Sequence, residues 1–192
     1  MASCGSSRLG RLRTDALCGS SRLGRLRTDA LGGSSRLGRL RPDGHLLFAY
    51  GSNLAAEEVS PEARFLGTAV LPGFELALTR RSIRWGGGVA DVVPAPGGHV
   101  WGAAYDAPDA ALAALDRKEG AGFAYRRREV EVELGGELRH AVTYEVIDKD
   151  RQAPPATLEY RSLVLRGARE RGLPGEWLAT LESVLRGSVP AR

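Results

Sequence analysis

The stretch His45–Leu54, HLLFAYGSNL, decides the fold of this chain of 192 residues. From Leu46 to Tyr50 it is apolar or aromatic without a break, which predicts a short buried strand, and Gly51 ends that strand. Asn53 is then placed to cap a short helix over 55–59. The folded part of the chain therefore opens with a buried strand that the following segments have to cover.

Strand patterns dominate the middle of the chain, and helix patterns dominate its end. Strands are expected over 65–71, 74–80, 89–93, 100–105, 129–134 and 138–147, with turns at 72–73, 94–98 and 135–136. Helices are expected over 106–119, 157–171 and 175–185. The first of these helices has Asp106 as its cap and Gly120 at its end. This order predicts an α+β fold, a single domain with a mixed, curled sheet or β-barrel and flanking helices.

The first 44 residues form a tandem repeat that is separate from the domain. Cys4–Leu17 (CGSSRLGRLRTDAL) recurs without change at Cys18–Leu31, and a third copy departs from it at Gly32, Pro42 and Gly44. Each copy offers two or three leucines among glycine, serine and arginine, which is too little apolar surface to offset the entropy of ordering. We therefore expect 1–44 to be a disordered leader, 45–188 the domain and 189–192 a short tail.

The positive charge of the chain belongs to this leader. The formal net charge is +4, but nine of the 27 basic residues and three of the 23 acidic residues lie in 1–44. Nucleic-acid binding requires positive charge on the docking surface, so no nucleic-acid partner is expected. No apolar run is long enough for a membrane span, so no membrane partner is expected either.

Both cysteines, Cys4 and Cys18, occupy the same position of two repeat copies, so the domain contains none. A fold built on disulfides is excluded, and the cytoplasm is the expected location. The Arg- and Ser-rich leader also resembles an organelle transit peptide. Its regularly spaced Asp and Gly residues disfavour the amphipathic helix of such peptides, which makes organelle targeting the less favoured alternative.

Most common catalytic sets are missing from the sequence. His45, His99 and His140 lack the close spacing of a metal site, and no G-x-S-x-G motif of a serine hydrolase occurs. The glycines at 86–88 are not followed by the Lys and Ser/Thr of a phosphate-binding loop. A flexible turn or a close approach of two backbones explains this glycine run better.

Two features remain that could carry chemistry. The amides that follow Gly51 can converge on one spot before a short helix and so form a cradle for an anion or oxyanion. Glu119 ends a helix in LDRKEG, where the negative end of the macrodipole disfavours a carboxylate and makes it a better base. From the residues alone, a structural turn and an exposed glutamate at a helix end remain open as alternatives.

Several segments taken together resemble the γ-glutamylcyclotransferase family over nearly all of 46–186. They occur in the family's order and at about its spacing, although each alone is unspecific. They are FAYGSNL (Phe48–Leu54), WGGGVADVVPAPGGHVWGAAYD (Trp85–Asp106), LDRKEG (Leu115–Gly120), APP (Ala153–Pro155) and GARERGLP (Gly167–Pro174). The YGSN form is similar to the branch of the family that acts on γ-glutamyl amino acids.

This resemblance implies a compact α+β fold that contains a β-barrel, with no cofactor and no metal. It also implies a site, whose members are the catalytic base Glu119 and the substrate-binding residues Tyr50, Gly51, Ser52, Asn53, Leu54, Tyr144 and Tyr160. Asp116, one helical turn before Glu119, ranks second as the base. The implied partner is a small γ-glutamyl dipeptide, and a homodimer is a further expectation from the family.

The implied reaction is attack of the substrate's own α-amine on its γ-carbonyl, which yields 5-oxoproline and a free amino acid. This reaction needs no nucleophile from the enzyme, in agreement with the missing Ser-His and Cys-His sets. Related cyclotransferases that act on glutathione or γ-glutamylamines are alternatives. A non-catalytic γ-glutamyl-binding paralogue is another, although the presence of Glu119 and Tyr50–Asn53 argues against it.

Overall fold

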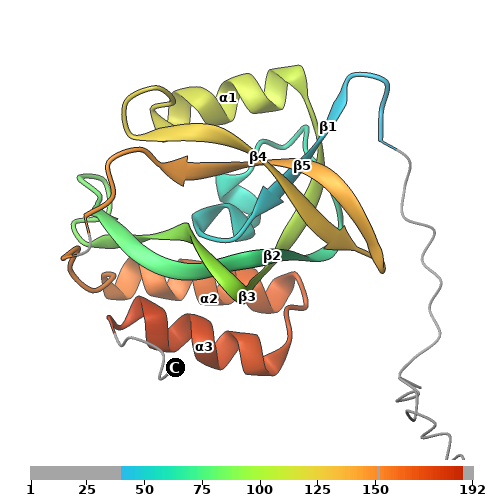
Figure 1. Cartoon of the computed structure of the whole chain (residues 1–192). Coiled ribbons are helices and arrows are strands. Elements are labelled where there is room, and N and C mark those ends of the chain that lie inside the picture. Colours follow the sequence, from blue (N-terminus) through green and yellow to red (C-terminus); the bar gives the residue numbers. More distant parts are fainter. Residues whose placement is uncertain (1–39, 151, 188–192) are drawn as a thin grey trace, which may run out of the picture. The chain divides into compact units, whose positions relative to one another are not determined.

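Five strands close into a barrel in the order β1-β3-β2-β4-β5 (Figure 1). They are β1 (Gly44–Ala49), β2 (Arg64–Arg81), β3 (Gly88–Pro108), β4 (Tyr125–Leu134) and β5 (Glu137–Val146). Neighbouring strands are antiparallel except β1 and β5, which are parallel. The computed structural model describes residues 40–150 and 152–187. The predicted α+β fold with a barrel is confirmed, whereas 1–39 of the expected leader and the tail 189–192 lie outside the described residues.

β2 and β3 are each one long strand where the sequence predicts two. The expected turn at Pro72-Gly73 lies inside β2. The pairing register between β2 and β3 shifts there, between Pro72 and Phe74. Gly73 has a φ of 77°, which favours glycine, and Pro72 donates no backbone hydrogen bond. The two residues therefore bend the strand without ending it, so the predicted turn at 72–73 is wrong. In β3, Pro94 pairs with Phe74 and His99 pairs with Pro72, so 95–98 leave the ladder at the predicted turn without ending the strand.

Helix α1 (Asp109–Glu119) follows β3 directly and begins later than the sequence predicts. The predicted cap, Asp106, belongs to β3, and its fully buried side chain pairs with Arg41 at 3.2 Å and with Arg64 at 3.0 Å. A carboxylate held by two arginines inside the barrel wall cannot cap the helix, and Pro108 takes the cap position. The prediction for Asp106 is wrong, whereas Gly120 ends the helix as predicted.

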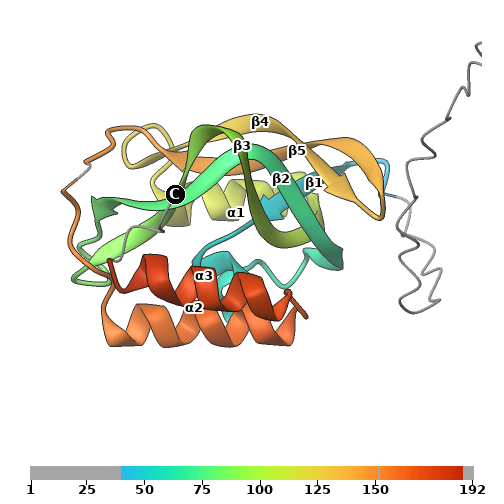
Figure 2. The ribbon, with the colours of Figure 1, turned by 60° about the horizontal axis from the view of Figure 1, so that its bottom comes forward.

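Helices α2 (Leu158–Glu170) and α3 (Gly175–Leu185) lie side by side on one side of the barrel (Figures 1 and 2). They bury Val164, Leu181 and Leu185 completely or nearly so, and these side chains belong to the same core as the barrel interior. No helix within 40–150 and 152–187 is long and apolar enough to cross a membrane.

Two 3-10 helices, η1 (Ser52–Leu54) and η2 (Ala56–Glu58), occupy the place of the short helix that the sequence predicts after β1. Helix α2 packs directly on this segment, because a Cβ atom at Gly167 would lie only 2.5 Å from the Ala55 nitrogen. A residue larger than glycine would push the helix away. This contact therefore positions the chain that follows β1.

The glycine run at 86–88 serves the close backbone approach that the sequence predicts. A Cβ atom at Gly87 would lie 2.9 Å from the Pro155 oxygen, and one at Gly88 would lie 2.0 Å from the Pro154 oxygen. The Gly88 amide also donates a hydrogen bond to the Pro155 carbonyl at 3.1 Å. The run thus binds the start of β3 to the segment that leads into α2.

Candidate active site

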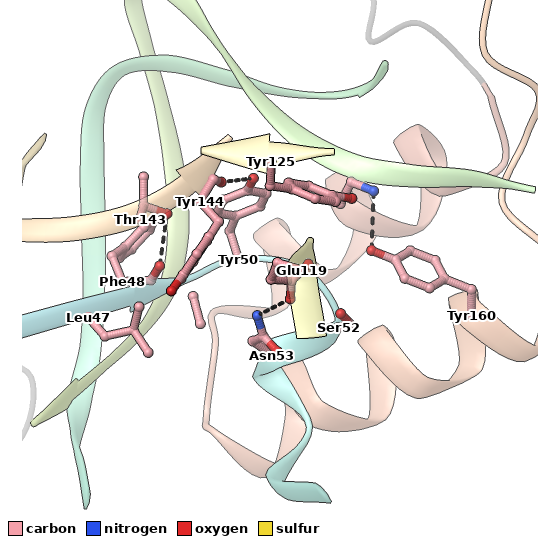
Figure 3. A pocket seen from close by; sticks show the side chains of 13 residues that line it. Leu47, Phe48, Tyr50, Ser52, Asn53, Glu119, Tyr125, Thr143, Tyr144 and Tyr160 are labelled. Atoms are coloured by element: carbon pink, nitrogen blue, oxygen red, sulfur yellow. Dashed lines mark hydrogen bonds between the residues drawn. The ribbon is translucent and has the colours of Figure 1, made fainter. Parts of the chain in front are cut away.

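Most of the predicted site residues line one cavity, beside the end of β1 (Figure 3), which we call the Glu119 cavity. It contains about 390 Å³ of empty space, part of it open to solvent. The predicted residues that line it are Tyr50, Gly51, Ser52, Asn53, Glu119, Tyr144 and Tyr160. Leu54 does not line it, because its side chain is fully buried in the core and its amide donates a hydrogen bond to the Gly51 carbonyl at 3.0 Å.

Gly51 is the residue at which the chain leaves β1 and enters η1. Its φ is −116°, so a left-handed conformation is not the reason for a glycine here. A Cβ atom would lie 3.2 Å from the Tyr160 hydroxyl and 3.4 Å from the Ala90 Cβ, so the chain passes unusually close to the opposite wall. The next amides, of Ser52 and Asn53, lie at the start of η1, where amides have no carbonyl partner within the helix.

Glu119 meets the side chain of Asn53 across the cavity. The Asn53 Nδ2 donates a hydrogen bond to Glu119 Oε1 at 3.0 Å, and the Asn53 Oδ1 accepts one from Lys118 Nζ at 2.7 Å. An ammonium group can only donate, so Oδ1 must face Lys118 and the amide nitrogen must face Glu119. Lys118 therefore fixes which end of the Asn53 amide the Glu119 carboxylate contacts.

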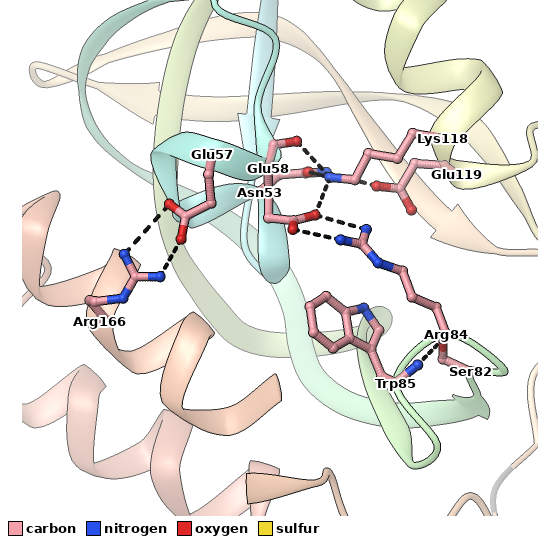
Figure 4. A network of polar contacts seen from close by, with 9 residues as sticks. All are labelled: Asn53, Glu57, Glu58, Ser82, Arg84, Trp85, Lys118, Glu119 and Arg166. Carbon is pink, nitrogen blue, oxygen red and sulfur yellow. Dashed lines mark hydrogen bonds and ion pairs between the residues drawn. The ribbon is translucent and has the colours of Figure 1, made fainter. Parts of the chain in front are cut away.

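Glu58 holds Lys118 in this position (Figure 4). The Lys118 ammonium donates to the Glu58 carbonyl at 2.5 Å and lies 2.8 Å from the Glu58 carboxylate, which also accepts two hydrogen bonds from Arg84 at 3.0 and 2.8 Å. Burial raises the pKa of the Glu58 carboxyl, but the hydrogen bonds from Arg84 and Lys118 outweigh burial and hold that pKa below its ordinary value. Glu58 is therefore an anion that fixes two cations beside the cavity.

Asp116, the second-ranked base, does not line the Glu119 cavity. Arg127 donates to both of its carboxylate oxygens, at 2.8 and 2.6 Å, and the Tyr144 hydroxyl donates to it at 2.8 Å. The hydrogen bond from Arg127 holds the pKa of Asp116 below its ordinary value. A carboxylate bound in this way is a weak base, so the geometry favours Glu119.

Three buried tyrosines shape the walls of the cavity. The Tyr50 hydroxyl donates to the Tyr144 carbonyl at 2.5 Å, and the Tyr160 hydroxyl accepts a hydrogen bond from the Ala90 amide at 3.2 Å. Burial raises the pKa of all three hydroxyls above the ordinary value of tyrosine. They are therefore neutral near pH 7 and do not compete with Glu119 as a base.

Tyr125 is a cavity residue that the sequence analysis missed. It begins β4, lines the Glu119 cavity, and its hydroxyl has no hydrogen-bond partner among the residues that the structure describes. Burial raises the pKa of this hydroxyl, so it is a neutral donor. Its only signal in the sequence is an aromatic residue at the start of the strand that follows the glycine-rich loop after Glu119.

The cavity is suited to acid–base chemistry. Glu119 Oε2 accepts no hydrogen bond from any described residue, so one carboxylate oxygen is available to a bound molecule. Ser52, Asn53 and Tyr125 line the cavity, and the Tyr125 hydroxyl supplies a neutral donor. Across 40–150 and 152–187, no group of three His, Cys, Asp or Glu side chains is arranged to hold a metal ion.

Comparison with known proteins identifies the family. The family described as "Gamma-glutamyl cyclotransferase, AIG2-like" matches residues 47–162, which include Tyr50, Glu119 and Tyr160. The chain is 33% identical over 152 residues to γ-glutamylcyclotransferase of Bos taurus, and 31% identical over 150 residues to that of Homo sapiens. Each alignment covers 74% of this chain and 79% of the relative. A solved γ-glutamyl cyclotransferase structure matches with a TM-score of 0.69 at 29% identity, over 78% of this chain and 92% of the other. The chain belongs to the γ-glutamylcyclotransferase family.

Proposed function

We propose that this protein converts γ-glutamyl amino acids to 5-oxoproline and a free amino acid, with Glu119 as the general base. The observation that carries the proposal is the position of Glu119. Its carboxylate lines the same cavity as the turn Tyr50–Asn53 and has one oxygen without a partner among the described residues, whereas Asp116 is bound by Arg127 outside the cavity.

The proposed reaction begins with the α-amine of the substrate, which is protonated in solution and has to lose a proton before it can attack. Glu119 Oε2 takes this proton, and the amine nitrogen then forms a bond to the γ-carbon. The attacking nitrogen then gives up a second proton as the bond between the γ-carbon and the acceptor nitrogen breaks. Glu119 passes both protons in turn to the acceptor nitrogen, which leaves as an ammonium group. The products are 5-oxoproline and the free acceptor amino acid, and Glu119 ends in its starting state.

Neutral donors stabilise the charge that develops on the γ-carbonyl oxygen. The amides of Gly51, Ser52 and Asn53 bind either the α-carboxylate of the substrate or this oxyanion, and the Tyr125 hydroxyl is a further donor. The cavity also has to hold the γ-glutamyl chain folded back on itself, because ring closure requires the amine and carbonyl to meet. Two tyrosines of the wall provide that shape. Tyr50 is held by its hydrogen bond to the Tyr144 carbonyl, and Tyr160 is held by its hydrogen bond from the Ala90 amide. We expect this activity in the cytoplasm.

The substrate class is tested by release of 5-oxoproline from γ-Glu-Ala, glutathione and γ-Glu-ε-Lys under the same conditions. We expect the highest kcat/KM for γ-Glu-Ala. A preference for glutathione or γ-Glu-ε-Lys would assign the protein to another branch of the family. No release from any of the three by the folded protein would contradict an enzymatic function and favour a binding role.

A further inference from the structure

A second and larger cavity adjoins the Glu119 cavity. It contains about 850 Å³ of empty space, part of it open to solvent. The two cavities share four lining residues, Ser52, Glu119, Tyr125 and Tyr160. Glu119 therefore stands between two adjoining spaces, and a bound molecule can extend from one into the other past its carboxylate.

The lining of this second cavity is strongly basic. Its cationic side chains are Arg80, Arg84, Arg117 and Lys118, and its one carboxylate is that of Glu119. Arg84 and Lys118 are paired with Glu58 (Figure 4). Arg80 and Arg117, in contrast, have no hydrogen bond or ion pair with any residue in the described part of the chain. Two guanidinium groups without a partner among the described residues therefore line an open cavity beside the proposed base.

We propose that this second cavity, the acceptor cavity, binds the amino acid that the reaction releases, and that Arg80 and Arg117 bind its carboxylate. The inference rests on the proposed function, because it assumes a γ-glutamyl substrate in the Glu119 cavity. According to this inference, Arg80 and Arg117 make the enzyme prefer substrates whose acceptor carries a carboxylate to substrates whose acceptor is a plain amine.

The chemistry of the substrate places the acceptor carboxylate here. In a γ-glutamyl amino acid, the nitrogen that leaves is bonded to the carbon that carries the carboxylate. If the γ-glutamyl group fills the Glu119 cavity and its scissile bond lies at Glu119, the acceptor extends into the adjoining space. A guanidinium binds a carboxylate through charge-assisted hydrogen bonds, often two in parallel.

Arg80 and Arg117 come from two different elements, the end of β2 and the last turn of α1. They can therefore approach one carboxylate from two sides. The same cavity is lined by the exposed apolar side chains of Ile83 and Phe123, 101% and 80% exposed. These offer contact surface and no hydrogen bonds to an acceptor side chain. We therefore expect the carboxylate, more than the side chain, to determine which acceptors are used.

The experiment compares γ-Glu-Ala with γ-glutamyl ethylamide, which is the same molecule without the acceptor carboxylate. The full chain is assayed as wild type, as Arg80→Gln, as Arg117→Gln and as the double variant, with release of 5-oxoproline as the readout. Arg81→Gln is the matched control, because Arg81 is the exposed neighbour of Arg80 and lines neither cavity. Thermal unfolding verifies that each variant is folded.

We expect wild type and Arg81→Gln to prefer γ-Glu-Ala over the ethylamide by tenfold or more in kcat/KM. Each single variant is expected to reduce this preference, mainly through a higher KM for γ-Glu-Ala, by about tenfold per lost charge-assisted bond. The double variant should treat the two substrates nearly alike.

Two results would overturn the inference. An equal loss of kcat/KM for both substrates would show that the arginines bind the γ-glutamyl portion, and wild-type kcat/KM for both substrates would show that they bind neither portion. Failure of wild type to release 5-oxoproline from either substrate would instead reject the proposed function itself.

Discussion

At the scale of single residues, the site depends on what each of two carboxylates contacts. Glu119 and Asp116 lie one helical turn apart on α1, yet Asp116 is bound by Arg127 and Tyr144 while Glu119 contacts Asn53 and the cavity. The different surroundings of the two carboxylates suggest different roles.

Lys118 is expected to act as a positioning residue. Lys118→Met removes the donor that fixes the Asn53 amide, so the amide can turn its oxygen toward Glu119 and repel that carboxylate. We expect kcat to fall by about 10- to 100-fold, the range expected from misplaced catalytic groups. Lys118→Arg retains a cationic donor and should recover part of the loss. Equal activity of Lys118→Met and wild type would reject this role.

Tyr125 and Tyr50 provide a matched pair of phenylalanine substitutions. Tyr125→Phe removes a hydroxyl that has no hydrogen-bond partner in the described part of the chain, so kcat should fall about tenfold while the melting temperature is unchanged. Tyr50→Phe removes the donor to the Tyr144 carbonyl and should cost about 1 kcal/mol of stability. Burial raises the pKa of the Tyr125 hydroxyl, so the loss of kcat caused by Tyr125→Phe should be constant from pH 6 up to about pH 9. A loss of activity confined to one end of this pH range would contradict a neutral donor.

The sequence predicts part of the residue-level site. The turn Tyr50–Asn53 and Glu119 are found from the resemblance, and all of these residues line the cavity. Tyr125 and Lys118 could not be predicted, because their roles depend on α1 and β4 meeting η1, far away in the sequence. Leu54 lies next to cavity residues in the sequence, but the tight turn of η1 directs its side chain into the core.

At the scale of elements, the order of strands and helices is predictable, but the continuity of the strands is not. Proline and glycine at 72–73 usually indicate a turn between two strands, whereas here β2 pairs with β3 on both sides of them. Long strands in a closed barrel must bend, and such residues supply the bend. The sequence pattern of a tight turn and that of a bend are therefore similar.

Glu58 joins three elements, because it lies in η2 and pairs with Lys118 of α1 and with Arg84 between β2 and β3. We expect Glu58→Gln to cost about 1–2 kcal/mol at pH 7, an estimate reduced by the solvent exposure of Arg84. The pKa of Glu58 is lower in the fold than its ordinary value of 4.5, so its contribution is complete above that pH.

This contribution is lost as the pH falls through the lower, folded-state pKa of Glu58. Melting temperatures of wild type and Glu58→Gln between pH 7 and pH 3 test this, and the two curves should converge toward the acid end. A difference that stays constant down to pH 3 would show that Glu58 does not stabilise the fold through its charge.

At the scale of the whole molecule, the end of the third repeat copy, residues 40–44, contacts the barrel. Arg41 belongs to the segment expected to be a leader, but its guanidinium pairs with the buried Asp106 and donates to the Glu62 and Asp106 carbonyls. Gly44 stands where the first two copies have alanine, and a Cβ atom there would lie 2.1 Å from Asp106 Oδ1. The difference at Gly44 therefore follows from contact with the barrel, which the repeat pattern alone does not reveal.

Arg41→Gln should therefore destabilise the domain. It leaves Asp106 with Arg64 as its remaining cation, so we expect a loss of about 1–3 kcal/mol and a melting temperature several degrees lower. Arg27→Gln, at the equivalent position of the second copy, is the control and should leave the melting temperature unchanged. Equal effects of the two substitutions would contradict a specific role for the third copy.

The central claim is that Glu119 is the base of a cyclotransferase, and the most direct test is the rate of 5-oxoproline release from γ-Glu-Ala by Glu119→Gln. Glutamine keeps the shape and can still contact Asn53, but it cannot accept the proton. We predict that kcat falls by about 10²- to 10⁴-fold, as for other general bases, in a folded protein, while Asp116→Asn keeps most of its activity. Near-wild-type turnover by folded Glu119→Gln would contradict the claim.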